Sequence, residues 1–188
     1  ELIEQFSLER VSKSGAKFDY EKGKWFNHQY LQLKSNEELA EQFMPYLEKA
    51  IGEGQLAIDK AQVAKDIGWT KDRVNFVSEL WEQVNFFFVA PEEYDEKSLK
   101  KRWKEDSPKH MTEMLALLEA HEDWSAEGLD NLIMPWIAEK EYGVGIVMNA
   151  FRICLVGAAR GPHIWNITDV LGKEETLRRV RTALEKLG

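Results

Sequence analysis

The segment that decides the fold reads FRICLVG from Phe151 to Gly157, GPHIW from Gly161 to Trp165 and VLGKEETLRR from Val170 to Arg179. Glycine ends the first apolar run and interrupts the last one, which predicts two helices on either side of a tight Gly-Pro turn. Arginines stand at both ends of the segment. We interpret the segment as a loop that rigid helices present beside positive charge, which is the arrangement a helical protein needs to read an exposed loop of nucleic acid.

The rest of the chain also has helical periodicity and helical start signals. Asp19 is a candidate N-cap, and Ser35–Glu38 has the form of a capping box. Pro45 should kink one helix, and Pro135 should interrupt another. No β-alternation of useful length occurs, so we predict an all-α fold. The expected helices run from Tyr20 to Tyr30, from Ser35 to Gly52, from Asp59 to Gly68, from Thr70 past Val84, from Ser107 past Leu118, from Ser125 to Tyr142, from Gly143 to Ala158, from Asn166 to Leu171 and from Lys173 to Leu187.

The apolar run from Phe86 to Pro91 divides the chain into two helical subdomains. A run of three aromatic residues ended by proline is typical of a core plug between subdomains. We therefore predict a small helical bundle over residues 1–88 and a second helical subdomain over residues 89–188.

The charge is unevenly distributed along the chain. The 188 residues have a formal net charge of −8, which argues against a nucleic-acid partner for the chain as a whole. From Phe151 onward, however, seven basic residues face four acidic ones. A nearby phosphate feels this local balance because more distant charges are screened. The asymmetry permits an anion site in the last forty residues but does not demand one, because a solvated charged face is the commoner explanation.

Several function classes find no support in the sequence. The single cysteine, Cys154, lies in an apolar run and reads as a buried, inert thiol, compatible with a reducing compartment. The four histidines are far apart, so we expect no metal site, and no nucleophile constellation or phosphate-binding glycine loop occurs. No stretch reaches the roughly 20 apolar residues that a membrane span needs. We therefore predict no active site and no membrane segment in these residues.

Four patches stand in order along the chain: Phe6–Asp19 with Lys24–Asn27, Lys71–Val74 ahead of Phe86–Phe88, Gly145–Met148 leading to Phe151-Arg152 and Gly157, and Gly161-Pro162 with Leu171–Glu174. Together they resemble glutamyl-tRNA synthetases of the bacterial type, which are class I aminoacyl-tRNA synthetases. In that family an all-helical anticodon-binding region follows a Rossmann-type catalytic domain. The chain lacks the two catalytic signatures and looks like the anticodon-binding region alone, with a helical cage as its second subdomain.

The resemblance implies which residues read the anticodon. Arg73 matches an arginine that discriminates the third anticodon base, and Arg152 matches an arginine on the central helix of the second subdomain. Gly161, Pro162 and Ile164 match a loop that packs on splayed-out anticodon bases. Arginine forks and loop backbone groups reach the edges of unstacked bases, so the assignment is chemically reasonable. Without the resemblance, a salt bridge within the fold is the simpler role for Arg152.

Other residues of the closing segment have two readings each. Trp165 is either a platform on which a base stacks or a core anchor beneath the loop. The arginines near the C-terminus are either phosphate contacts or part of a solvated helix face. The candidate phosphate contacts are Arg160, Arg178, Arg179 and Arg181.

The resemblance also implies a parent enzyme and its partners. The parent would be a monomeric, cytoplasmic glutamate–tRNA ligase that attaches glutamate to tRNA-Glu with ATP and Mg²⁺, and its catalytic domain would be a partner of this chain. We expect no cofactor in these residues themselves. The chain begins at Glu1 without methionine, which suggests a fragment. A helical protein–protein interaction module without RNA binding remains the alternative, favoured by the acidic first 150 residues.

Overall fold

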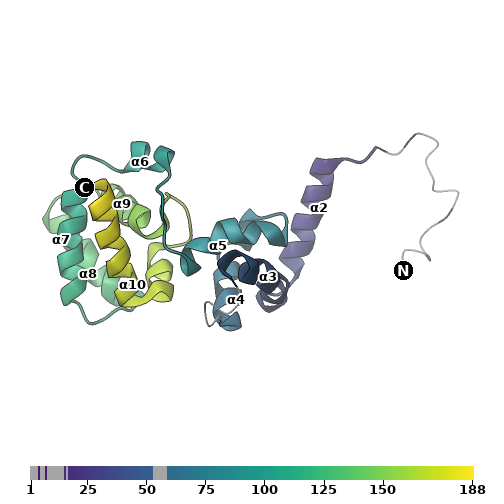
Figure 1. Cartoon of the computed structure of the whole chain (residues 1–188), viewed down its shortest axis with the longest axis horizontal. Helices are drawn as coiled ribbons and strands as arrows, with labels where there is room; N and C mark the ends of the chain where they lie inside the picture. The colour runs from purple at the N-terminus through teal and green to yellow at the C-terminus, as the bar shows by residue number, and fades with distance from the viewer. Residues whose placement is uncertain (1–3, 5–6, 8–14, 16, 53–58) are drawn as a thin grey trace.

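The computed structural model describes residues 4, 7, 15, 17–52 and 59–188, and every regular element among them is helical (Figure 1). The all-α prediction is confirmed. Most of the patch from Phe6 to Asp19 lies outside the described residues, as do Glu53 and Gly54.

The first group of helices begins at the predicted caps. The Asp19 side chain accepts a hydrogen bond from the Lys22 backbone N–H. The capping box is also confirmed, because Ser35 Oγ accepts from the Glu38 N–H at 3.1 Å while Glu38 Oε2 accepts from the Ser35 N–H at 2.9 Å. The group contains α2 (Tyr20–Leu33), α3 (Asn36–Ile51), α4 (Lys60–Gly68) and α5 (Leu80–Phe88), coloured from purple to teal in Figure 1. Pro45 lies within α3.

The predicted long helix from Thr70 is wrong. Two short 3-10 helices, η2 (Lys71–Arg73) and η3 (Val77–Glu79), precede α5 instead. Thr70 Oγ1 donates to the Asp66 carbonyl at 3.2 Å, and Glu79 Oε2 accepts from the Asn75 N–H at 2.7 Å. These side chains take backbone partners that a continuous helix would use. Val74, Leu80 and Val84 of this stretch are nevertheless buried.

The second group surrounds the apolar helix expected from Gly143 to Ala158. Residues 153–156 of that helix are buried, and it ends at Gly157 in the left-handed conformation with φ 78°. The last helix breaks at Gly172, where φ is 70°, as the predicted division into two pieces requires. Pro135, in contrast, does not interrupt its helix. The group contains α6 (Glu96–Arg102), which the sequence did not predict, α7 (Ser107–Ala120), α8 (Ala126–Glu139), α9 (Val144–Val156) and α10 (Ile164–Leu187).

The two groups share one hydrophobic core. Phe86 and Phe87 are 2% and 7% exposed and pack against each other with ring centroids 4.4 Å apart, as the core-plug prediction requires. The segment after α5 then passes close to the end of α9: a Cβ atom on Gly157 would lie 2.7 Å from the Pro91 side chain. The Asp95 N–H donates to the Gly157 carbonyl at 2.7 Å. The division at residues 88 and 89 itself stays a prediction.

No described helix is long and apolar enough to cross a lipid bilayer. The first group holds one buried acid, Asp66 of α4, which has no exposed surface. Its Oδ1 accepts from Gln62 Nε2 at 2.8 Å, while Oδ2 has no hydrogen-bond partner. Burial raises the pKa of this carboxyl to about 7, because the charged form loses its hydration.

We expect the free energy of unfolding of Asp66→Asn, relative to that of the wild type, to increase as pH rises from 4 to 7. The native carboxyl binds its proton more tightly than the unfolded one, so the free energy of unfolding of the wild type falls by up to about 1.4 kcal/mol per pH unit over this interval. Above pH 7 the two variants should differ by a constant amount. Urea unfolding at pH 5, 6, 7 and 8 measures this. Glu41→Gln, an exposed change on α3, is the control, and parallel pH curves for wild type and Asp66→Asn would contradict the prediction.

Candidate functional site

Arg152 fixes the loop between α9 and α10. One terminal nitrogen, Nη1, donates to the Pro162 carbonyl at 2.6 Å and to the Arg160 carbonyl at 3.2 Å. Gly161 has φ 107°, and a Cβ atom there would lie 3.2 Å from the Phe86 ring, so this position favours glycine twice over. Arg152 forms no ion pair with a described residue. The structure therefore does not support a salt-bridge role for Arg152.

A pocket of about 220 Å³ opens beside Arg152. This volume is smaller than the roughly 300–1,000 Å³ of pockets that enclose drug-sized ligands, and it suits a single planar ring. Apolar side chains from α8, α9 and α10 form its walls, and polar groups stand among them. The lining consists of Met134, Met148, Asn149, Arg152, His163, Ile164 and Trp165.

Sequence reasoning missed four of these residues. Met148 and Asn149 stand four and three positions before Arg152, a spacing that places both on the same face of the helix as Arg152 and was available as a signal. His163 is exposed directly after Pro162 in the loop. Met134 comes from another helix, and no local pattern links it to the site.

Arg73 lies on the other group of helices, in η2, where α2 holds the backbone. Gln32 Nε2 donates to the Lys71 carbonyl at 2.9 Å, and His28 Nδ1 lies 2.8 Å from the Val74 carbonyl oxygen. The Arg73 side chain is 43% exposed, and its one ion-pair contact is Asp72 at 3.9 Å. It lines an open hollow with Trp25. The guanidinium therefore stays accessible on a fixed turn.

Arg73 and Arg152 interact electrostatically although they lie on different groups of helices. Burial lowers the pKa of Arg152, and the positive charge of Arg73 lowers it further. No described carboxylate pairs with Arg152, so the space beside this guanidinium is positive, whereas Arg73 lies 3.9 Å from the Asp72 carboxylate. A positive space attracts phosphate groups and the acceptor atoms of base edges. Arg73 and Arg152 line different pockets, and their roles in reading the anticodon stay predictions.

Trp165 is a core anchor and not a stacking platform. Its side chain is 3% exposed, its Nε1 donates to Asp130 Oδ1 at 2.8 Å, and its ring packs near Phe151. Pro162 and Ile164 are also largely buried. The loop therefore offers its backbone, with His163 the exposed side chain beside Pro162. The anticodon contacts expected at Gly161, Pro162 and Ile164 stay predictions.

The predicted role of Arg179 as a phosphate contact is wrong, because this residue is only 3% exposed. Its Nη1 donates to the Phe86 carbonyl at 2.6 Å and to the Leu155 carbonyl at 2.7 Å, and its Nε donates to Glu175 Oε1 at 2.7 Å. Burial lowers the pKa of this guanidinium, while Glu175 opposes the shift. Both carbonyls lie in the last turns of their helices, α5 and α9, where backbone acceptors lack intrahelical partners. Arg179 is thus a structural bridge between the two groups.

The other candidate phosphate contacts are exposed. Arg178 forms a two-point pair with Glu175 at 2.6 and 2.7 Å, and Arg181 pairs with Glu119 at 2.6 Å. Arg160 donates to the Glu82 carbonyl. Exposed pairs of this kind contribute little to stability and exchange readily for a phosphate, so these three assignments stay predictions.

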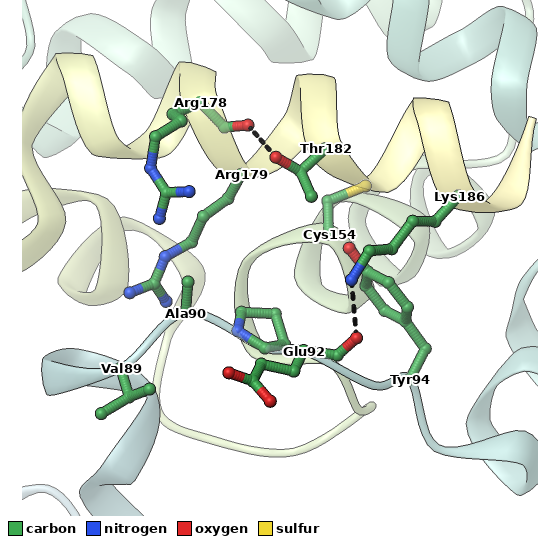
Figure 2. A pocket seen from close by; sticks show the side chains of 10 residues that line it. Val89, Ala90, Glu92, Tyr94, Cys154, Arg178, Arg179, Thr182 and Lys186 are labelled. Atoms are coloured by element: carbon green, nitrogen blue, oxygen red, sulfur yellow. Dashed lines mark hydrogen bonds between the residues drawn. The ribbon is translucent and has the colours of Figure 1, made fainter.

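A second cavity, of about 300 Å³, lies between α10 and the segment from Val89 to Tyr94 (Figure 2). Lys186 crosses its mouth and donates to the Glu92 carbonyl at 2.7 Å. The Cys154 thiol faces this cavity and is fully buried, and burial raises its pKa, which confirms the expected inert cysteine. The described residues contain no cluster of three or more His, Cys, Asp or Glu side chains that could bind a metal ion.

A family model described as the anticodon binding domain matches residues 38–184 of the chain. The chain is 55% identical to the glutamate–tRNA ligase of Bacteroides thetaiotaomicron over 187 residues, which is 100% of this chain and 36% of that protein. It is 52% identical to the glutamate–tRNA ligase of Porphyromonas gingivalis over the same shares of each. The chain thus spans about a third of the length of these curated relatives.

A solved structure shows the same fold. The glutamate tRNA ligase from Elizabethkingia meningosepticum, determined in complex with its amino acid, superposes with a TM-score of 0.83 at 37% sequence identity. The alignment covers 100% of this chain and 36% of that structure.

We expect Arg179→Met to lower the free energy of unfolding by about 3–5 kcal/mol, because it leaves two buried carbonyls and part of Glu175 unpaired. Arg178→Met removes an exposed arginine from the same carboxylate and is the matched control, with an expected loss below about 1 kcal/mol. Chemical denaturation of both variants provides the comparison. Equal losses would show that Arg179 is no more than a surface ion pair.

Proposed function

The chain belongs to the anticodon binding domain family, and from this premise we propose that it binds tRNA-Glu through the anticodon. The observation that supports this most directly is the electrostatic effect of Arg73 on Arg152. The two arginines come from separate groups of helices, and Arg152 lines a pocket of about 220 Å³ while Arg73 lines an open hollow.

Anticodon bases suit this arrangement because they can be unstacked and read individually. A guanidinium donates through a planar fork to the edge of a base, and it also stacks on base faces, which lysine does not do. We assign the third anticodon base to Arg73. A second base contacts Arg152 and the loop backbone at Gly161 and Pro162, beside Ile164. Arg160, Arg178 and Arg181 supply phosphate contacts.

We further propose that the chain is part of a monomeric, cytoplasmic glutamate–tRNA ligase that attaches glutamate to tRNA-Glu. The described residues lack a cluster that fits Mg²⁺, so no chemical step is assigned to them. The rest of the polypeptide, including its catalytic domain, would bind ATP, Mg²⁺ and glutamate. These residues select the tRNA. The alternative of a protein–protein module without RNA binding is not favoured by the family match.

The test is binding of the full-length polypeptide to unmodified tRNA-Glu transcripts that differ at single anticodon bases. We expect Arg73→Gln to reduce discrimination at the third base by about 1–3 kcal/mol, since one forked contact to a base edge is lost. Discrimination at the other two bases should remain.

Arg178→Gln is the control for the loss of an arginine charge. This variant should weaken the binding of all the transcripts by the same factor or leave it unchanged, since a phosphate contact carries no sequence information. The assignment to Arg73 fails if Arg73→Gln behaves like this control. The proposed function fails if the wild type does not distinguish the transcripts.

A further inference from the structure

A second positive surface lies at the other end of α9, away from the arginine pocket. Three cationic side chains, those of Lys101, Arg102 and Lys104, line a hollow of about 260 Å³ together with the first turn of α9. All three are exposed, and no hydrogen bond or ion pair joins their side chains to another described residue. We call this surface the α6 hollow; its lining is Lys101, Arg102, Lys104, Gly143, Gly145 and Ile146.

The floor of the α6 hollow is open backbone. Gly143 is the N-cap of α9 and provides no side-chain cap. Its carbonyl accepts from the Ile146 N–H at 2.8 Å, so the N–H groups of Val144 and Gly145 are the ones left without a partner among the described residues. A Cβ atom at Gly145 would meet no atom within 4 Å, which shows that this turn faces open space. The partial positive charge of a helix start therefore adds to the three cations.

One face of α9 connects the α6 hollow to the arginine pocket. Gly145, Asn149 and Arg152 stand at i, i+4 and i+7, so they form a single stripe along the helix. Asn149 Nδ2 donates to the Gly145 carbonyl at 2.6 Å and lines the arginine pocket as well. The stripe is seven residues long, about 10 Å. An extended polyanion whose base enters the pocket thus passes the hollow within a few nucleotides.

We propose that the α6 hollow binds the sugar-phosphate backbone of the same RNA that the arginine pocket reads. The inference rests on the proposed function and adds to it a contact that does not depend on sequence. The unpaired cations and the start of α9 bind phosphate. The Ile146 side chain is 43% exposed and offers an apolar contact for ribose. Neither distinguishes one base from another.

The sharpest test is the pair Gly145→Glu and Gly145→Gln in the full-length polypeptide, with tRNA-Glu transcript as the probe. Both side chains have room, and a carboxylate in the first turn of a helix is stabilising. Gly145→Glu should therefore melt at the same or a higher temperature than Gly145→Gln, yet bind the transcript roughly tenfold more weakly at 100 mM salt. Equal binding by the two variants would overturn the proposal.

A second comparison removes cations instead. The double variant Lys101→Gln/Lys104→Gln should reduce the slope of log affinity against log salt by about one to two, because each phosphate contact releases close to one counterion. Lys49→Gln/Lys60→Gln removes two exposed lysines from α3 and α4 and is the matched control.

The two proposals fail separately. If the wild type does not discriminate between anticodons, the proposed function is wrong, while the salt slopes still report on the α6 hollow. If the hollow variants match their controls for every transcript, the hollow does not contact RNA, and an acidic protein surface becomes its candidate occupant. A loss confined to one anticodon base would also contradict a backbone contact.

Discussion

The buried guanidinium of Arg179 is the interaction on which the arrangement of the two helical groups depends. A helix that ends inside a protein leaves carbonyl groups without partners, and two such ends, those of α5 and α9, meet between the groups. Arg179 donates to both of them through one nitrogen and to Glu175 through another. A positive charge near two helix C-termini is also favourable for the helix dipoles. Arg179 thus supplies hydrogen-bond donors to the buried ends of α5 and α9 and joins the two groups of helices through the same contacts.

The functional residues are attached to the elements that this bridge joins. Arg152 lies on α9 one turn before Leu155, which accepts from Arg179. Phe86 accepts from Arg179 through its carbonyl, and its ring limits the space at Gly161 in the reading loop. The Lys65–Asp169 pair, 2.8 Å long, connects α4 to α10 as well. The position of the loop relative to Arg73 is therefore set by core and backbone contacts.

Local signals in the sequence predicted most of the helices. Asp19 and Ser35 act within a few residues of their own position, so their caps could be read directly. The stretch after Thr70 could not be read in this way, because the Thr70 and Glu79 side chains compete with the backbone for partners. Helix α6 was missed since it is short, and none of its residues is fully buried.

The candidate site could be predicted only in part, because local signals in the sequence do not report contacts between distant segments. Arg178 and Arg179 are neighbours of the same residue type, but about 100° of helical rotation separates them, and one faces solvent while the other lies in the core. The break at Gly172 resets the phase of α10, so counting along the sequence does not show which arginine is which. Met134 enters the pocket from a different helix. The resemblance supplied Arg73 and Arg152, whereas the pocket beside Arg152 follows from the packing of distant segments.

The close passage of the Pro91 segment over Gly157 has a consequence for the nucleic acid. A Cβ atom on Gly157 would lie 2.7 Å from the Pro91 side chain, and the Asp95 N–H donates to the Gly157 carbonyl. Lys186 of α10 donates to the Glu92 carbonyl of the same segment. These contacts join the two groups of helices and so hold Arg152 in a fixed position relative to Arg73. In the proposed function the RNA would therefore deform to reach both arginines, and separating stacked bases costs about a few kcal/mol per step. RNA loops that open easily would then bind better before any base edge is contacted, so the proposed site would select for the flexibility of the RNA as well as for its sequence.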